Sequence, residues 1–412
     1  MKNLYIHISR LFLLLIFFAA TARAQEAWKW EQVAPLQTAR MGHCAAAFGN
    51  RIYVFGGMTL RRQMEITRTV EIYNPVRDEW VEGEPLLIPL YQASAVVSGG
   101  YIYILGGTSR EGEPNNEIFK FDPRNNRHVR FGSLPHPRWA MGSVSVNRRV
   151  LIIGGITGRQ EYRRDGYWWN PDSAQWNPSP QLNNPSAGFG LAFNGILWTV
   201  GGMSFGPMNR VEVLRNGSWE LLPRRANLPE PRGELGVTFL GDTMLIAAGG
   251  IGRDGIASDV FALATDSLTW SRLPDLNDGR AEFSLITLQD QVYAVGGGTR
   301  DPNHMGYILS SVEVLKKAND VDQGFAPLLP TEFKPTIWPN PTNGNVTILL
   351  PRTANRLQMA DMNGRIVNDT QIIGNANVWT EDASRYPAGR YQVIFFDAGG
   401  VARPAGGLTV LK

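Results

Sequence analysis

Gly-Asn-Arg-Ile-Tyr-Val-Phe-Gly-Gly, residues 49–57, is the stretch of sequence that decides the fold. A Gly-Asn pair that favours a tight turn is followed by a short apolar, β-prone run that ends on two adjacent glycines. The double glycine ends similar runs five more times, at spacings of 50, 48, 47, 48 and 47 residues, at Gly106-Gly107, Gly154-Gly155, Gly201-Gly202, Gly249-Gly250 and Gly296-Gly297. This period predicts six copies of one structural unit.

Each repeat predicts four short strands. The run before the double glycine forms a hairpin with the segment preceding it, and a third strand such as residues 70–73 follows a variable loop. A turn then leads to a fourth strand that opens with tryptophan in four repeats, at Trp80, Trp176, Trp219 and Trp270, while the second repeat has His128 near this position. Four strands in each of six repeats predict an all-β, six-bladed β-propeller, because radial repetition leaves only short sheet edges exposed.

The sixth repeat lacks its fourth strand, and the missing strand is found at the other end of the chain. Residues 30–36, Trp-Glu-Gln-Val-Ala-Pro-Leu, match residues 80–86 and 270–276 position for position. We therefore expect the N-terminal strand to close the ring inside the last blade.

The double glycine, the spaced aromatic residues and the tryptophan together resemble the kelch repeat. The resemblance covers residues 28–316 and is specific for the fold, because six copies stand in register. It implies a propeller and says little about function, since one fold carries many functions.

The N-terminal residues 1–24 read as a signal peptide. Lys2 and Arg10 lie near an apolar run over residues 11–20, and Ala22-Arg23-Ala24 predicts cleavage before Gln25. A run of this length is too short to cross a bilayer, which needs about 20 apolar residues, so no transmembrane segment is expected.

The rest of the chain divides at the point where the glycine period stops. We expect a propeller over residues 25–316, a polar and proline-containing linker over 317–335 and a small C-terminal β-sandwich over 336–412. Without further motifs, this pattern fits either a carbohydrate-binding module or a spacer.

Three segments of the last unit, residues 338–344, 361–367 and 387–391, resemble the type A sorting domain of the type IX secretion system. The resemblance implies a Bacteroidetes-type secreted protein that is first exported to the periplasm. The type IX secretion machinery is then its partner, and its destination is the medium or the outer cell surface.

Composition excludes several classes of function. The formal net charge is only +3 and no Lys/Arg-rich run is present, so nucleic acid is not an expected partner. Cys44 is the single cysteine, and the histidines after residue 24 are scattered over different repeats, at His43, His128, His136 and His304. We expect no disulfide, no metal and no cofactor.

Four arginines are the strongest candidates for ligand binding. Arg40, Arg138 and Arg280 stand sixteen residues before the first glycine of their pair, and Arg232 stands seventeen before. They are expected around the mouth of the central channel, where planar guanidinium groups suit carboxylates, sulfates or phosphates. The alternative is a framework role, with each arginine bonded to loop carbonyls or to a neighbouring acid. Trp139 is a further candidate, either stacking on a sugar or packing between blades.

Glu234 and Glu282 are weaker candidates, for catalysis. Residues two apart on a strand share a face, which would place them beside Arg232 and Arg280, and the two carboxylates would approach each other near the channel. Such a pair shifts one pKa upward and could act as an acid/base couple. The function expected from the sequence is binding of an acidic glycan or an acidic protein segment by a secreted or cell-surface propeller. The alternative is a carbohydrate-active enzyme such as a mutarotase or epimerase of an acidic sugar.

Overall fold

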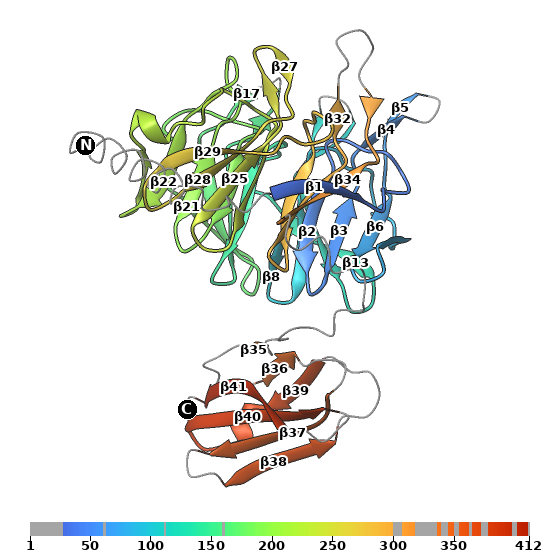
Figure 1. Cartoon of the computed structure of the whole chain (residues 1–412), viewed down its shortest axis with the longest axis vertical. Helices are drawn as coiled ribbons and strands as arrows, with labels where there is room; N and C mark the ends of the chain where they lie inside the picture. The colour runs from blue at the N-terminus through green and yellow to red at the C-terminus, as the bar shows by residue number, and fades with distance from the viewer. Residues whose placement is uncertain are drawn as a thin grey trace, which may run out of the picture. The chain divides into compact units, whose positions relative to one another are not determined.

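The computed structural model divides the chain into two compact units, Met1–Asp322 and Gln323–Lys412 (Figure 1). It describes residues 28–60, 63–110, 113–158, 161–299, 307–317, 336–338, 345–349, 354–361, 365–371, 378–397 and 402–410. The predicted signal peptide and residues 318–335 of the predicted linker lie outside these residues, and the predicted segment bounds stay predictions. Within the described ranges the chain forms strands and two short 3-10 turns, and none of its helices could span a membrane.

The first unit is built from six four-stranded antiparallel sheets, here called blades 1 to 6, each given from its inner to its outer strand. Blade 1 contains β2 (Cys44–Phe48), β3 (Arg51–Phe55), β6 (Val70–Asn74) and β7 (Glu79–Glu82); blade 2 contains β8 (Ser94–Ser98), β9 (Tyr101–Leu105), β12 (Glu117–Asp122) and β13 (Arg127–Ser133); blade 3 contains β14 (Gly142–Val146), β15 (Arg149–Ile153), β18 (Gly166–Asn170) and β19 (Gln175–Pro178). Blade 4 contains β20 (Gly190–Phe193), β21 (Leu197–Val200), β22 (Val211–Arg215) and β23 (Ser218–Leu221); blade 5 contains β24 (Gly236–Leu240), β25 (Met244–Ala248), β28 (Val260–Ala264) and β29 (Thr269–Leu273); blade 6 contains β30 (Ser284–Leu288), β31 (Gln291–Val295), β34 (Val312–Lys317) and β1 (Trp28–Val33).

The blades form a closed ring. Each inner strand packs on the inner strand of the next blade, and β30 of blade 6 packs on β2 of blade 1. The predicted propeller is therefore confirmed.

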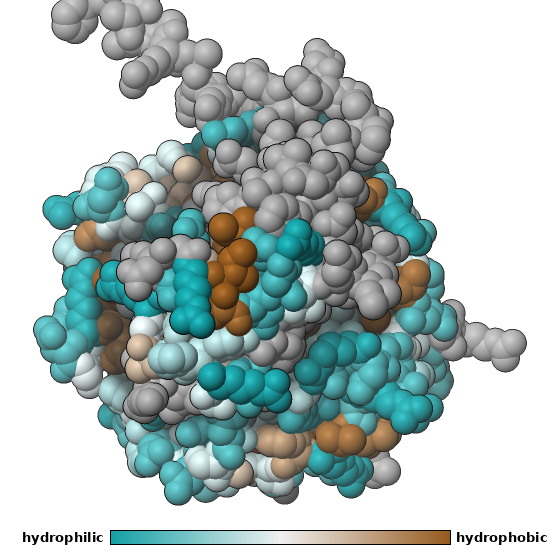
Figure 2. Space-filling model, turned by 90° about the horizontal axis from the view of Figure 1, so that it is seen from below, coloured by the Kyte–Doolittle hydropathy of each residue, from teal (hydrophilic) through white to brown (hydrophobic). Residues whose placement is uncertain are grey.

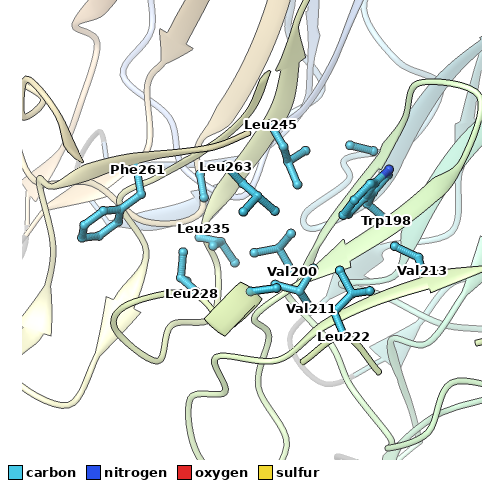
Figure 3. Close-up of a cluster of buried hydrophobic side chains, with 13 residues drawn as sticks. Trp198, Val200, Val211, Val213, Leu222, Leu228, Leu235, Leu245, Phe261 and Leu263 are labelled. Carbon is cyan, nitrogen blue, oxygen red and sulfur yellow. The ribbon is translucent and has the colours of Figure 1, made fainter. Parts of the chain in front are cut away.

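The hydrophobic core lies between neighbouring blades. In the cluster drawn in Figure 3, Trp198 and Val213 of blade 4 pack with Leu245 and Leu263 of blade 5. Second strands such as β3 are almost wholly buried because a blade covers each of their faces, which explains the unbroken apolar runs before the glycine pairs.

The glycine pairs allow one blade to approach the next. Gly56 and Gly57 have φ of +62° and +98°, and a Cβ on Gly56 would lie 2.4 Å from the Leu90 carbonyl oxygen, on the segment that leads into blade 2. A side chain there would meet both backbone strain and a steric clash.

The N-terminal strand closes the ring as predicted. β1 pairs with β34 from Trp28↔Lys317 to Val33↔Val312. The Trp30 indole donates a 3.0 Å hydrogen bond to the Pro274 carbonyl oxygen at the end of blade 5, and Trp80 donates a 2.8 Å bond to Ala34 at the end of blade 6. The repeated tryptophan thus ties each of these outer strands to the previous blade.

One face of the propeller, here called the loop face, carries the hairpins that follow the double glycines (Figure 1). The hairpins are β4 (Met58–Leu60) with β5 (Met64–Ile66), β10 (Thr108–Arg110) with β11 (Glu113–Pro114), β16 (Ile156–Thr157) with β17 (Glu161–Tyr162), β26 (Ile251–Gly252) with β27 (Gly255–Ile256) and β32 (Gly298–Thr299) with β33 (Tyr307–Ile308). The loops that lead into the inner strands lie on the same face, and one of them contains the turn η1 (Arg224–Ala226).

The second unit is a β-sandwich, which confirms the predicted class. One sheet contains β35 (Thr336–Trp338), β36 (Asn345–Leu349) and β39 (Val378–Asp382), and the other contains β37 (Ala354–Asp361), β38 (Ile366–Gln371), β40 (Gly389–Asp397) and β41 (Ala402–Val410). The turn η3 (Ala383–Arg385) follows β39. Val346 and Ile348 of the first sheet pack against Leu357, Val393 and Phe395 of the second.

Candidate functional site

The arginines of blades 1 and 6 hold their blades together from inside. Arg280 is 0% exposed and donates from Nη1 to the carbonyl oxygens of Gly296 (2.9 Å) and Ser311 (3.2 Å). Its Nη2 forms an ion pair with Glu313, which is also 0% exposed. Arg40 makes the equivalent contacts in blade 1, to Gly56, Thr69 and Glu71. A guanidinium group suits this site because its N–H donors form a fixed fork, and two carbonyl oxygens and a carboxylate lie within hydrogen-bond distance of them.

Blades 3 and 5 use the same arrangement with a shorter acid. Arg138 donates to the Gly154 and Asp165 carbonyl oxygens and pairs with the Asp165 carboxylate at 3.0 Å. Arg232 contacts Gly249 and pairs with Asp259.

The four arginine side chains are buried rather than exposed around the channel mouth, and their contact with a ligand stays a prediction. Each side chain points into its own blade, because the carbonyl of the first glycine and a strand-borne acid lie there, and Arg232, the most exposed of the four, is 5% exposed. The geometry matches the framework alternative. Because these side chains are buried and already paired, they offer a ligand little surface to contact.

A closed ring of six backbone hydrogen bonds surrounds the channel axis two residues further along each repeat. The ring positions are Gly42, Gln92, Ala140, Gly188, Glu234 and Glu282, all with φ between +48° and +60°. Each N–H donates to the carbonyl oxygen of the ring residue in the preceding blade, and Gly42 closes the circle by donating to Glu282 at 2.8 Å. The individual bonds measure 2.6–3.1 Å. The sequence contains a signal for this ring, because in blades 1, 3, 5 and 6 the ring residue stands two positions after the buried arginine. The residue types at the six ring positions vary too widely, however, to suggest a shared role.

Two glutamates lie side by side on this ring. The Glu282 N–H donates to the Glu234 carbonyl oxygen at 3.1 Å, so the expected approach of the two residues near the channel is present in the structure. Neither glutamate pairs with the arginine two residues before it. The expected strand alternation fails because both glutamates have φ of +53°, which turns their side chains away from the direction of the arginines.

Tyr91 and Gln92 of blade 2 complete the cluster. The Tyr91 hydroxyl donates a 2.5 Å hydrogen bond to Oε2 of Glu282, although the two residues belong to blades 2 and 6. The ring of Tyr91 passes over Gly42, where an added Cβ would lie 2.1 Å from Cε2. Only glycine at this position lets the tyrosine reach across blade 1.

The two carboxyl groups hold protons more tightly than free glutamic acid. Burial, and then the neighbouring charge of Glu282, raise the pKa of Glu234 to about 8. Burial also raises the pKa of Glu282, while hydrogen bonds from Tyr91 and Gln92 oppose that rise. Near neutral pH the pair therefore holds a proton, because burial and mutual repulsion disfavour two charged carboxylates side by side.

A cavity of about 190 Å³ continues from the ring into the central channel. Its wall comes from the inner strands of all six blades and is mostly small or apolar, with Gly142, Gly190 and Gly236 among its residues. Ser94 and Ser143 bring their hydroxyl oxygens to 2.5 Å of each other in this wall. Trp139 occupies the position before ring residue Ala140 and is half-buried, so its indole is only partly available to a ligand.

Exposed apolar side chains lie on the loop face in the β4–β5 hairpin and in the loop after Gly201-Gly202. Leu60 is 56% exposed, Met64 is 47% exposed, and Phe205, in the loop after Gly201-Gly202, is fully exposed. Figure 2 views the molecule from below the orientation of Figure 1 and so does not show the loop face; the face that it draws is mainly hydrophilic, with hydrophobic residues in small separate patches.

The neighbouring residues His43 and Cys44 are both buried. Burial lowers the pKa of His43 to about 3 and raises the pKa of Cys44 to about 12, so both side chains are neutral. In the part of the chain that the structure describes, no three His, Cys, Asp or Glu side chains come together to hold a metal ion.

Comparison with known protein families agrees with this geometry. The kelch motif model matches residues 39–87, 89–135 and 137–183, and the secretion system C-terminal sorting domain model matches residues 336–401. The chain contains kelch motifs and a secretion system C-terminal sorting domain. The sorting domain implies handling by the type IX secretion system and a secreted or cell-surface location for this kelch protein.

The relatives of the kelch propeller are similar over part of their length. Alpha-scruin of Limulus polyphemus is 33% identical over 32% of this chain and 15% of its own length. Human Kelch-like protein 23 is 23% identical over 50% of this chain and 36% of its own length. The chain therefore spans well under half of these relatives. A solved structure titled "Structure of YjhT" superposes with a TM-score of 0.59 at 16% identity, covering 70% of this chain and 98% of that one, which shows the fold alone.

The glutamate pair predicts a particular pH dependence of stability. Because the pKa of Glu234 rises from 4.5 to about 8 on folding, the folded state binds more protons than the unfolded state between these values, and stability falls as pH rises through 8. We expect Glu234→Gln to remove this fall, so that its free energy of unfolding at pH 9 exceeds that of wild type by roughly 1 to 3 kcal/mol. Chemical denaturation from pH 5 to pH 9 measures the difference, and parallel curves for the two proteins would contradict the assignment.

Proposed function

We propose that this secreted kelch protein is a non-catalytic binding module whose ligand contacts the loop face. The observation that supports the proposal is that buried groups hold the scaffold rigid while apolar side chains of the loops are exposed. The four buried arginines, the ring of backbone hydrogen bonds and the inter-blade core fix the bases of the loops. Leu60 and Met64 of the β4–β5 hairpin and Phe205 of the blade 4 loop are exposed. Function commonly resides in loops on such a rigid scaffold.

We further propose an acidic ligand, either a glycan or a protein segment. The four buried arginines do not support an acidic ligand. The support comes instead from exposed arginines of the loop face. Arg164 follows the β16–β17 hairpin and Arg253 lies in the β26–β27 hairpin, and both are exposed. Exposed guanidinium groups can pair bidentately with carboxylates or sulfates.

A binding screen with matched variants tests both parts of the proposal. The full-length protein is applied to an array of acidic and neutral glycans and to acidic peptides, and the affinity for any ligand found is measured by calorimetry. We expect Arg164→Ala and Arg253→Ala each to weaken binding about ten- to a hundredfold, since each charged hydrogen bond lost costs roughly 1.5 to 3 kcal/mol.

Arg77→Ala is the matched control, because Arg77 is equally exposed but lies on the turn between β6 and β7, at the opposite face. Equal losses in the control and in the loop-face variants would contradict the loop face as the site. Binding confined to neutral ligands would contradict the acidic class.

The glutamate pair supports a second candidate function, a carbohydrate-active enzyme such as a mutarotase or epimerase of an acidic sugar. Glu234 with its raised pKa would donate a proton, and Glu282, held by Tyr91, would accept one. Two NMR measurements on acidic sugars separate this function from binding: faster exchange between the α- and β-anomers reports a mutarotase, and uptake of solvent deuterium at the inverted carbon reports an epimerase. Catalysis lost in both Glu234→Gln and Glu282→Gln would favour the enzyme, and no catalysis in wild type would exclude it for the sugars tried.

For the route out of the cell, we propose export to the periplasm with cleavage before Gln25, followed by recognition of the C-terminal unit by the type IX machinery. The apolar run over residues 11–20 and the match to the sorting domain support this order.

A further inference from the structure

Blade 4 keeps the acceptors of the arginine site but lacks the arginine. Ser186 stands two residues before ring residue Gly188, the position that Arg280 holds before Glu282 in blade 6. The strand pairing that brings two of the acceptors together is retained, since the N–H of Gly201 donates to the Arg210 carbonyl oxygen at 2.9 Å as that of Gly296 donates to Ser311 at 3.1 Å.

The acid is also retained in the same setting. Glu212 accepts hydrogen bonds at Oε2 from the backbone N–H (3.3 Å) and the side-chain amide (2.9 Å) of Asn183. Asn277 makes the same two bonds to Oε2 of Glu313 in blade 6, at 2.8 and 2.7 Å, and there the other carboxylate oxygen pairs with Arg280. Glu212 is only 6% exposed, and among the described residues no cationic side chain forms an ion pair with it.

A cavity of about 20 Å³ lies where the arginine would be. Ser186, Thr199, Gly201 and Glu212 line it, together with Met208 and Arg210 toward the outside. Ser186 is 5% exposed and its Oγ is buried without a hydrogen-bond partner. The volume suits a group of about the size of a water molecule, so the nitrogen end of a planar cation fits, and the flexible, half-buried thioether of Met208 can give way to the rest.

We propose that this pocket of blade 4 binds a guanidinium group supplied from outside the chain, in the place that an arginine side chain occupies in blades 1 and 6. The comparison within one chain selects the ligand class, because the Gly201 and Arg210 carbonyls and the Glu212 carboxylate repeat the acceptor set that holds Arg40 and Arg280. The guanidinium comes from a free guanidino compound or from an arginine side chain of a partner protein. The pocket is separate from the proposed loop-hairpin contacts, so either proposal can fail alone.

Thermal denaturation of the full chain with methylguanidinium chloride tests the proposal. At millimolar concentrations, far below those that denature proteins, we expect the Tm to rise by a few degrees at ten times the Kd, because a ligand that binds only the folded state stabilises it. Sodium chloride and urea at equal concentrations are the controls for charge and for shape. No rise above these controls would overturn the proposal.

Two variants locate the effect. Ser186→Arg supplies the guanidinium from within the chain, so we expect a higher Tm than wild type and no response to methylguanidinium. Glu212→Gln keeps an acceptor for Asn183 but removes the charge, and we expect no response. A full response in Ser186→Arg, or a Ser186→Arg protein no more stable than wild type, would contradict the proposal.

The guanidinium group of Arg210 is an alternative occupant of the pocket from within the chain, since this side chain is exposed beside the cavity and can turn inward. If Arg210 filled the site, Arg210→Ala would be destabilised and would respond to methylguanidinium while wild type would not, which would overturn binding from outside. Titration with a glycine-flanked arginine peptide, against the same peptide carrying citrulline, then distinguishes the two sources. Binding of the arginine peptide supports a partner protein, and binding of methylguanidinium alone supports a free compound.

Discussion

Replacement of Arg280 by alanine is expected to destabilise the propeller by roughly 3 to 5 kcal/mol, the cost of breaking a buried ion pair from one side. Glu313 would keep its carboxylate in a site that is 0% exposed, with only Asn277 as a hydrogen-bond donor on its other oxygen. The Gly296 and Ser311 carbonyl oxygens would also lose their side-chain donor. Chemical denaturation of wild type and Arg280→Ala measures the loss.

Arg272→Ala is the control for this prediction. Arg272 also pairs with an acid, Asp275, but both side chains are exposed, and such pairs contribute little to stability. We expect its Tm to be nearly unchanged. An unchanged Tm in Arg280→Ala would instead return Arg280 to the set of candidate ligand contacts.

The fold could be predicted from the sequence because it depends on local patterns that repeat. Each double glycine marks a backbone that must take positive φ against the next blade. Four outer tryptophans, Trp30, Trp80, Trp219 and Trp270, mark a hydrogen bond to the blade before them. The closing strand was predictable for the same reason, since residues 30–36 carry the repeat pattern without the rest of a repeat.

The direction of the arginines could not be predicted in this way. Spacing placed Arg40 and Arg280 near the channel, but their partners, Glu71 and Glu313, lie 31 and 33 residues away on the third strand, and only the folded blade brings them together. The glutamate pair shows the opposite case. Glu234 and Glu282 were expected to approach each other for a reason that failed, strand alternation, and they meet because a ring of left-handed residues connects neighbouring blades.

Loss of β1 is expected to have the largest effect of all. Deletion of residues 25–36 removes the fourth strand of blade 6 and the buried Trp30, which is 7% exposed and belongs with Ile246 and Leu315 to the core cluster of blades 5 and 6. Replacing Trp30 alone by alanine should cost about 3 to 5 kcal/mol, as for other buried aromatic residues. The deletion also removes the strand pairing with β34 and the Ala34 acceptor of Trp80, so its cost approaches the roughly 5 to 15 kcal/mol that stabilise a whole domain.

Trp28→Ala is the matched control for Trp30→Ala, because Trp28 lies on the same strand but is only half-buried, and we expect a much smaller fall in Tm.

The deletion has a second expected consequence. Without β1, the long strand β34 becomes an unprotected sheet edge, so the truncated chain should self-associate at concentrations where the full chain does not. Light scattering during denaturation measures this directly. A truncated chain with the Tm and the mass of a folded monomer would mean that blade 6 is stable with three strands, and that the N-terminal strand is not what closes the ring.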